Sequence, residues 1–283
     1  MLDFARMIAV RGWRRVARQA AQWSRDRALV SFLGRHSIED AVLLSGFPKS
    51  GNTWTRFVFF NYHSVLLDDA RQTLTYDQLN RIQHHALEWP LDGDFTAGYP
   101  VFFRTHLAYR KVFDVFRVIY VMRNPLDTLV SYYHSQNDRV VPFPRHSRSL
   151  RRRLADIDFF VRYTLERWIR HVKTTAPRAD VVLRYEEMRA DPEGQFRRMF
   201  RGVGIEPDQE ALRRAVSLSS RESIRRMGRL SGQKAGGSET LFSAGYEFVR
   251  SGEPRQYLSR LAGETIDYAR RALGRSGLEE IEL

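Results

Sequence analysis

Cysteine is absent from the 283-residue sequence. This absence excludes disulfide bonds, thiolate-ligated zinc and a thiol nucleophile, and it fits a reducing compartment. Long apolar stretches are also missing. No run approaches the roughly 20 residues that span a bilayer, and the first residues lack a secretory apolar region followed by a small-residue cleavage site. We therefore expect a cytoplasmic protein, without internal repeats or low-complexity segments.

Positive charge is in excess, because 46 lysines and arginines face 33 aspartates and glutamates and give a formal net charge of +13. Such a balance attracts polyanions, which include nucleic acid, anionic lipid, an acidic acceptor and a multiply phosphorylated nucleotide. The arginines are spread along the chain, and no helix-turn-helix, zinc-finger or RNA-recognition signature accompanies them. We therefore expect no nucleic-acid binding.

Short β-rich runs alternate with helical segments along the chain. The runs lie at residues 41–45, 101–105, 117–122 and 181–185. The first run is continuously apolar, as expected of a strand covered on both faces. Asn124-Pro125 and Asp191-Pro192 follow two of the strands, and each places a capping side chain before a proline at a helix start. The alternation predicts an α/β fold of three layers, P-loop-like, with a central parallel sheet flanked by helices.

Residues 1–33 are predicted to form a basic amphipathic helix that extends from the N-terminus of the domain. Its apolar positions recur near helical spacing, with arginines between them. They are Phe4, Met7, Ile8, Trp13, Val16, Ala17, Ala20 and Trp23. Such a helix either rests on anionic lipid at the inner membrane surface or packs on its own domain, which is the commoner use of such a stripe. Residues 34–283 show no linker, and we assign them to a single domain.

A glycine-containing turn directly follows the first strand and leads into a helix. It reads Gly46-Phe47-Pro48-Lys49-Ser50-Gly51-Asn52-Thr53-Trp54. The unpaired N–H groups of a helix start and the positive end of its dipole form a seat for a phosphate group, to which Lys49 adds a full charge. In the motif of magnesium-dependent nucleoside triphosphatases the lysine follows the second glycine, whereas here it precedes that glycine. The difference disfavours a triphosphatase.

The stretch Pro-Lys-Ser-Gly-x-Thr-Trp resembles the motif that opens the family of sulfotransferases dependent on 3′-phosphoadenosine 5′-phosphosulfate (PAPS). The resemblance extends over about residues 41–257 and implies the family's fold and sulfuryl donor. It implies that Lys49 is the catalytic lysine and that the loop binds the 5′-phosphosulfate. The residues assigned to this contact are Lys49, Ser50, Gly51, Asn52, Thr53 and Trp54, with Asn52 standing where many members have threonine.

The strand that ends before Arg123 carries a second family motif, and Ser131 lies two turns along the helix that follows. The resemblance assigns Arg123 and Ser131 to the 3′-phosphate of the nucleotide. A guanidinium group at a strand end suits this task because it binds phosphate with two parallel hydrogen bonds. The resemblance also implies that Ser131, as a catalytic residue, engages Lys49 when no acceptor is bound.

The segment Arg104-Thr105-His106 resembles the Lys-Thr-His block of the family, whose histidine is the general base. His106 is therefore our candidate for that role. An imidazole titrates near pH 6.5 and can accept a proton near neutrality without large tuning of its pKa. Arg104 replaces the usual lysine, which preserves the positive charge and changes its geometry.

Three C-terminal segments complete the expected nucleotide site. Tyr185 lies in a stretch that resembles the family's Tyr-Glu-Asp-Met segment, whose tyrosine contacts adenine, and an aromatic face suits a purine. Ser219 and Ser220 resemble part of a Thr-Ser-Phe element near the nucleotide. The block around residue 250 resembles Arg-Lys-Gly-x-x-Gly, which clamps the 3′-phosphate. Its assigned residues are Arg250, Ser251 and Gly252.

The sequence therefore predicts a sulfotransferase that moves a sulfuryl group from PAPS to a hydroxyl or amine of a glycan, a lipid or a small natural product. Cationic side chains would take the place of a metal, so we expect none to be required. Two other functions stay open. One is a P-loop kinase-like phosphoryl transferase. The other is a non-catalytic protein that binds polyanions, or that binds membranes peripherally through residues 1–33.

Two charged or ionisable clusters lack a family assignment. The arginine-rich stretch at residues 145–153 either receives an acidic acceptor or is a solvated helix face, which is the more common case. His84 and His85 are adjacent in sequence and lack the i, i+4 spacing of a helical metal pair, so we expect surface or core roles for them.

Overall fold

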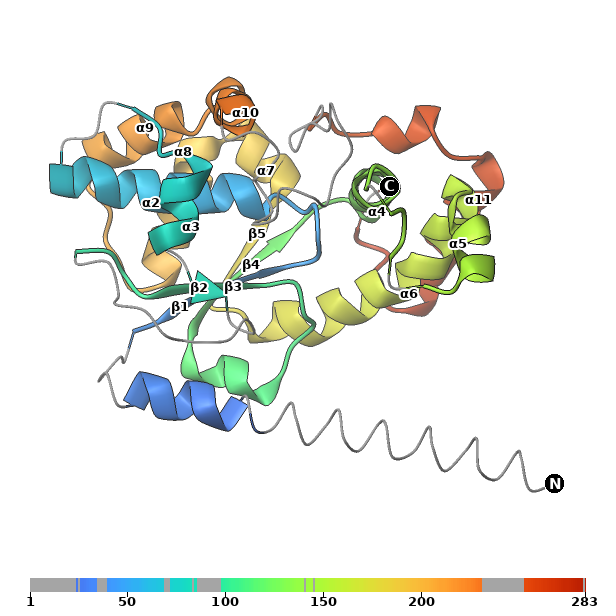
Figure 1. The fold of residues 1–283 in the computed structure, drawn as a ribbon, viewed down its shortest axis with the longest axis horizontal. Coiled ribbons are helices and arrows are strands. Elements are labelled where there is room, and N and C mark those ends of the chain that lie inside the picture. The colour runs from blue at the N-terminus through green and yellow to red at the C-terminus, as the bar shows by residue number, and fades with distance from the viewer. Residues whose placement is uncertain are drawn as a thin grey trace.

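The computed structural model describes residues 24, 26–34, 40–68, 72–82, 84–85, 98–139, 141–144, 146–230, 252–281 and 283. A parallel sheet of five strands runs through its centre in the order β2-β3-β1-β4-β5 (Figure 1). The strands are β1 (Val42–Gly46), β2 (His84–His85), β3 (Phe102–Thr105), β4 (Arg117–Met122) and β5 (Val181–Arg184). All four predicted strands are confirmed within one residue at each end, and the short β2 is an addition to them.

β1 is the middle strand and is buried along its whole length. Leu44 pairs with Arg104 of β3 on one side and with Ile119 of β4 on the other. The chain leaves β1, builds β2 and β3 on one side of it, and then returns to build β4 and β5 on the other side. The strand order therefore reverses at the carboxyl end of β1, which is where ligands bind in open α/β sheets.

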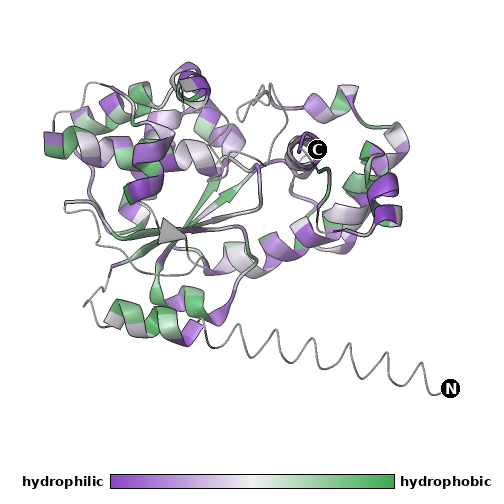
Figure 2. Ribbon diagram, in the orientation of Figure 1, coloured by the Kyte–Doolittle hydropathy of each residue, from purple (hydrophilic) through white to green (hydrophobic). Residues whose placement is uncertain are grey.

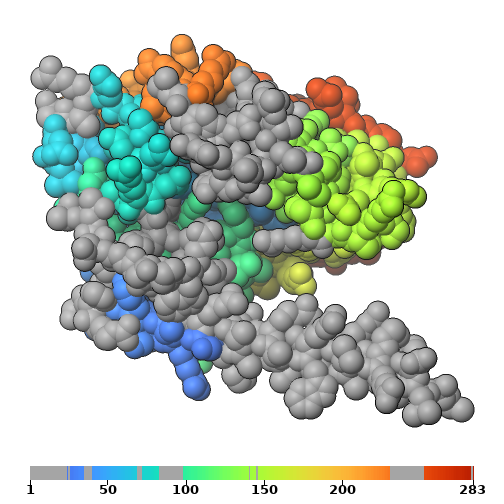
Figure 3. All heavy atoms as spheres, in the orientation of Figure 1, coloured from blue at the N-terminus to red at the C-terminus, as the bar shows by residue number. Residues whose placement is uncertain are grey.

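Helices cover both faces of the sheet. One face carries α2 (Asn52–Asp68), α3 (Tyr76–Ile82), α7 (Tyr185–Ala190), α8 (Pro192–Gly202), α9 (Gln209–Leu218) and α10 (Arg221–Leu230). The other face carries α4 (Pro125–Asn137), α5 (Arg148–Leu154), α6 (Ile157–Thr175), α11 (Gly263–Arg275) and the 3₁₀ turns η1 (Lys111–Val115), η2 (Ala176–Arg178) and η4 (Gln256–Ser259). Figure 3 shows α3 in teal and α5 in green on opposite sides of one molecular face. The predicted three-layer α/β fold is confirmed.

Alternation along the strands supplies a separate apolar surface to each layer. In β4, Ile119 and Val121 face the α2 side, whereas Tyr120 and Met122 pack with α4 and α6. The helices carry a mixture of hydrophobic and hydrophilic residues (Figure 2), as expected of helices with one face on a core. Trp168 on α6 is fully buried in the core between the sheet and the layer that contains α4, α6 and α11. Truncation of such a side chain to alanine costs about 3–5 kcal/mol.

Both predicted helix caps are present. Oδ1 of Asn124 accepts the N–H groups of Leu126 and Asp127 at 3.0 and 3.1 Å and begins α4. Oδ1 of Asp191 accepts the N–H of Gly194 at 2.9 Å and begins α8. The expectation that both caps directly follow a strand is wrong for Asp191, because the short helix α7 lies between β5 and α8.

The helix expected at residues 1–33 is described only near its end, where residues 26–34 are helical. Leu29, Phe32 and Leu33 of this stretch are buried against a cluster that includes Phe113 of η1 and Val118 of β4. The amphipathic positions from residue 4 to residue 23 lie outside the described residues. Within the described ranges, no helix is both long and apolar enough to cross a membrane.

Candidate active site

Four side chains predicted to act in the site come from the carboxyl ends of four neighbouring strands. His106 follows β3, the loop with Lys49 follows β1, Arg123 follows β4 and Tyr185 follows β5. Because these strands are parallel and adjacent in the order β3-β1-β4-β5, their carboxyl ends meet at one edge of the sheet. The topology therefore brings together residues that lie up to 136 positions apart in the sequence.

The loop after β1 adopts a conformation that few side chains tolerate. Lys49 has φ of 73° and Gly51 has φ of 117°, and a positive φ at a residue with a side chain costs on the order of 1 kcal/mol and concentrates at functional sites. A Cβ atom on Gly51 would lie 2.9 Å from Cδ2 of Tyr185. The loop backbone therefore packs directly against the tyrosine ring, and only glycine fits there.

Three polar atoms of this loop are buried and have no hydrogen-bond partner within the described part of the chain. They are Oγ of Ser50, Oδ1 of Asn52 and Nε1 of Trp54. Most buried polar groups in proteins are paired, so each exception calls for an explanation. Three such atoms within five residues at the N-terminus of α2 fit a polar ligand that supplies the missing donors and acceptors.

A hydrogen bond to the end of β1 determines the tautomer of the neutral His106 ring. Nδ1 of His106 lies 2.8 Å from the carbonyl oxygen of Gly46, and a carbonyl only accepts, so a neutral ring carries its proton on Nδ1. The amide Nδ2 of Asn52, 3.5 Å from the same nitrogen, donates to the carbonyls of Gly46 and Phe47 instead. The lone pair therefore resides on Nε2 of an exposed ring, as a general base requires.

A second histidine lies beneath this region and was missed by the sequence analysis. His171 belongs to the buried stripe of α6, and its Nδ1 lies 2.9 Å from the hydroxyl of Tyr120. Burial lowers the pKa of His171 to about 4, with a smaller contribution from the nearby His106. Burial also raises the pKa of Tyr120, so a protonated hydroxyl and a neutral imidazole share this hydrogen bond. The only sequence signal for His171 is its position on the apolar face of a helix, and that position is typical of ordinary core residues.

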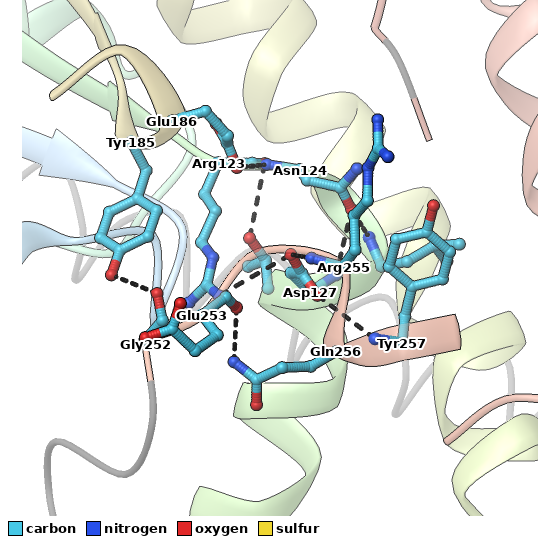
Figure 4. A network of polar contacts seen from close by, with 12 residues as sticks. Arg123, Asn124, Asp127, Tyr185, Glu186, Gly252, Glu253, Arg255, Gln256 and Tyr257 are labelled. Atoms are coloured by element: carbon cyan, nitrogen blue, oxygen red, sulfur yellow. Dashed lines mark hydrogen bonds and ion pairs between the residues drawn. The ribbon is translucent and has the colours of Figure 1, made fainter. Parts of the chain in front are cut away.

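Arg123 is held in place by a short strap at residues 252–257 (Figure 4). Its Nη2 donates to the carbonyl of Glu253 at 3.0 Å and lies 3.8 Å from Oδ2 of Asp127. The two carboxylate oxygens of Asp127 accept the backbone N–H groups of Arg255 at 2.7 Å and of Tyr257 at 3.3 Å. Asp127 is buried and thereby joins α4 to the strap. The sequence did not indicate this role, because an acidic residue in the first turn of a helix is common.

Tyr185 connects the loop after β1 to the same strap. Its hydroxyl donates to the carbonyl of Gly252 at 2.8 Å, and the guanidinium carbon of Arg123 lies 4.5 Å from its ring centroid. The Trp54 ring meets it edge-on, with centroids 6.1 Å apart. Burial raises the pKa of Tyr185, against the lowering effect of Arg123. Gly252 has φ of 64°, and a Cβ there would lie 2.8 Å from the tyrosine hydroxyl.

Glu253 forms ion pairs with two more arginines, which the sequence analysis did not assign to the site. Its carboxylate accepts a hydrogen bond from Nη1 of Arg221 and pairs with Nη1 of Arg189 at 3.0 Å. Hydrogen bonds from Arg221 and then Arg189 lower the pKa of Glu253. Arg189 also donates to the carbonyl of Gly252 at 2.8 Å. The strap and α7 are thus joined by charge as well as by backbone contacts.

The remaining predicted site residues have mixed surroundings. Ser131 is half-buried on α4, one turn beyond Asp127 on the same helical face. Ser219 is buried and accepts a hydrogen bond from Nδ2 of Asn61 at 2.9 Å, whereas Ser220 is exposed and its Oγ accepts the N–H of Ser223 at 3.2 Å. Thr53 is half-buried in the first turn of α2. Arg250 and Ser251 lie outside the described residues.

A hollow of the described surface lies away from these residues. It measures about 590 Å³ and is lined by β5, the end of α6 and the C-terminal segment, through residues that include Val182, Ala176 and Ile281. None of the predicted site residues lines it. Within the described ranges, no group of three or more histidine, aspartate or glutamate side chains could hold a metal ion.

Comparison with known proteins identifies the family. The model described as "Sulfotransferase domain" matches residues 39–274, and the chain therefore belongs to the sulfotransferase family, as its motifs predicted. Sulfotransferase 1C2 of Oryctolagus cuniculus is 26% identical over 209 residues, which are 66% of this chain and 66% of the rabbit protein. Cytosolic sulfotransferase 15 of Arabidopsis thaliana is 26% identical over 271 residues, 85% of this chain and 73% of the plant protein.

Solved structures agree on the fold. Retinol dehydratase in complex with androsterone and the inactive cofactor PAP superposes with a TM-score of 0.60 at 16% identity, covering 86% of this chain and 82% of that protein. Mouse sulfotransferase SULT7A1 complexed with PAP gives a TM-score of 0.58 at 18% identity, with coverages of 86% and 87%. At these identities the likeness concerns the fold alone. The chain spans about two thirds of the length of the rabbit relative.

Proposed function

We propose that this protein transfers a sulfuryl group from PAPS to a hydroxyl or amine of an acceptor. The observation that carries the proposal is the hydrogen bond between Nδ1 of His106 and the carbonyl of Gly46. It joins an exposed histidine to the last residue of β1, directly before the phosphate-type loop. Family membership and the PAP bound in the structural neighbours support the choice of donor.

The loop residues Lys49 to Trp54 would bind the 5′-phosphosulfate end of the donor. The unpaired atoms of Ser50, Asn52 and Trp54 support this assignment because a phosphosulfate and its bridging waters offer both donors and acceptors. Tyr185, packed on Gly51, would contact the adenine. Arg123, Ser131 and Gly252 would bind the 3′-phosphate, together with Arg250 and Ser251, while Ser219 and Ser220 border the nucleotide.

The mechanism follows from charge and geometry. PAPS supplies the sulfuryl group and a phosphate leaving group, and the transfer is an in-line displacement in which positioning and electrostatics dominate. Nε2 of His106 takes the acceptor proton as the acceptor atom attacks sulfur. Lys49 stabilises the negative charge that develops on the leaving phosphate, and Ser131 engages Lys49 before an acceptor binds. These steps use one imidazole, one ammonium and one hydroxyl side chain of the chain.

The acceptor is assigned to the broad class of hydroxyl or amine compounds, including glycans, lipids and small natural products. Arg104 is half-buried on β3, two residues before His106, and its positive charge would favour an acceptor with a negative group. Arg148, Arg151 and Arg152 lie on α5. They either form a solvated helix face or receive an acidic acceptor. The word cytosolic in the plant relative's name supports a cytoplasmic location.

The decisive test is incubation of the full chain with ³⁵S-labelled PAPS and a panel of acceptor classes. His106→Ala and Lys49→Ala should each lower turnover by about 10²–10⁴-fold, as for general acid–base groups, and should keep the affinity for adenosine 3′,5′-bisphosphate (PAP) within a few-fold. His146→Gln is a matched control, because His146 is a half-buried histidine on the segment before α5. Full turnover in either active-site variant would overturn the roles proposed here.

A thermal-shift comparison separates this function from phosphoryl transfer. PAP should raise the melting temperature by mass action, because it binds the folded state, whereas ATP with Mg²⁺ should raise it much less. A larger shift with ATP and Mg²⁺ than with PAP would favour the kinase-like alternative instead.

A further inference from the structure

Glu253 occupies an unusual electrostatic position beside the proposed 3′-phosphate site (Figure 4). Its carboxylate pairs with Arg189 and Arg221, and its own carbonyl accepts from Arg123 at 3.0 Å. Three guanidinium groups from three different elements thus meet at one residue. Such a cluster is the arrangement by which proteins bind phosphate groups, and here a carboxylate of the chain itself takes part in it.

The backbone of the strap is fixed on both sides of Glu253. On one side the Gly252 carbonyl accepts from Tyr185 and Arg189, both at 2.8 Å. On the other side Asp127 accepts the backbone N–H groups of residues 255 and 257, as described above. The Glu253 carbonyl also accepts from the side chain of Gln256 at 2.6 Å. The backbone therefore cannot carry the carboxylate away, but the side chain can rotate about its own bonds.

The charged side chains of this cluster differ in their exposure to solvent. The side chain of Arg123 is only 5% exposed and is packed on Tyr185. Those of Arg221 and Glu253 are 48% and 49% exposed, so their ion pair is open to solvent and worth little by itself. A phosphate dianion is a stronger partner than a carboxylate for a pair of guanidinium groups, since it brings more charge and more acceptor atoms.

We propose that Glu253 is an internal anion that occupies Arg189 and Arg221 until the 3′-phosphate of the nucleotide displaces it. The inference rests on the proposed function and adds Arg189 and Arg221 to the residues that bind that phosphate. Displacement leaves a negative carboxylate close to a negative phosphate, and their repulsion weakens binding. Glu253 therefore sets the nucleotide affinity lower than the arginines alone would give, and it speeds the release of PAP after transfer.

The test is calorimetric titration of the full chain with PAP and, separately, with adenosine 5′-monophosphate, which lacks the 3′-phosphate. Glu253→Gln keeps the size of the side chain and removes its charge, so it should tighten PAP binding about tenfold, the effect of about 1.4 kcal/mol. It should leave the affinity for the monophosphate unchanged. Arg221→Gln should weaken PAP binding about tenfold, because it removes a ligand of the phosphate.

Glu206→Gln is the matched control, since Glu206 forms a surface ion pair with Arg201, and it should leave PAP affinity unchanged. Thermal melting verifies that each variant is folded. If Glu253→Gln binds PAP as the wild type does or more weakly, Glu253 only orders the arginines and this inference is overturned. The proposed function stands in that case, provided that the wild-type chain binds PAP and transfers the sulfuryl group. Absence of PAP binding by the wild-type chain overturns the proposed function as well.

Discussion

Replacement of Asp127 by asparagine removes one charge from a buried position and leaves the shape of the side chain unchanged. The side chain of Asp127 is 0% exposed, and its two oxygens accept the N–H groups of Arg255 and Tyr257. An asparagine offers one acceptor oxygen, and its NH₂ group must face the other backbone N–H. We therefore expect a loss of stability together with a loosened strap.

The magnitude follows from the contacts that are lost. A buried N–H left without a partner costs about 1–3 kcal/mol, and breaking a buried ion pair costs about 3–5 kcal/mol. The second figure is an upper bound here, because the Arg123–Asp127 contact is 3.8 Å long and Arg123 keeps its hydrogen bond to Glu253. We expect Asp127→Asn to lower the free energy of unfolding by about 3 kcal/mol.

Urea denaturation followed by circular dichroism measures this change, and titration with PAP measures its effect on the site. Asp156→Asn is a matched control, because Asp156 caps α6 by accepting the N–H of Phe159 at 2.8 Å and asparagine caps equally well. The control should unfold like the wild type, whereas Asp127→Asn should also bind PAP at least tenfold more weakly. A difference in unfolding free energy below about 0.5 kcal/mol between the two variants would refute the role given to the strap.

Two further perturbations test the loop and the buried histidines. Gly51→Ala places a Cβ 2.9 Å from Tyr185 at a φ of 117°, so calorimetry should record PAP binding weakened at least tenfold and thermal melting a lower midpoint. The pKa values of His63 and His171 are lowered by burial to about 4. The unfolded chain binds more protons below pH 6.5, so stability is full above that pH and falls by about 2 kcal/mol per histidine between pH 7 and pH 5. Urea unfolding at both pH values measures this loss, and His171→Gln should remove about half of it. An equal loss of unfolding free energy in the wild type and in His171→Gln would contradict the prediction.

The sequence was sufficient for four of the five strands, because these depend on local patterns, and the resemblance to the family's motifs supplied the residues at their carboxyl ends. Continuous or alternating apolar runs predicted the strands, and the cap-plus-proline pairs predicted the starts of α4 and α8. Lys49, His106, Arg123 and Tyr185 lie within three residues after the observed ends of β1, β3, β4 and β5. Parallel topology then requires that such residues share one edge, so their proximity follows from the fold class.

The contacts that position those residues could not be predicted, because they join distant segments without a local signal. Glu253 meets Arg189 and Arg221 across 64 and 32 positions of sequence, and an arginine-rich chain offers many equivalent partners. Asp127 looks like an ordinary acidic residue in the first turn of a helix, where the macrodipole favours it. Only the three-dimensional structure distinguishes that role from a carboxylate that holds two backbone N–H groups.

The hydrogen bond from His106 to Gly46 makes the base and the donor loop depend on the same atom. Gly46 is the last residue of β1, and the loop proposed to bind the phosphosulfate begins at the next residue. A shift of Gly46 at the end of β1 would remove the carbonyl that holds the proton on Nδ1 of His106, and the neutral ring could then exchange its proton between the two nitrogens. The lone pair stays on Nε2 while Gly46 holds this position. The proposed base and the proposed donor loop therefore meet at the end of one strand, because β1 lies between the strands that precede His106 and Arg123.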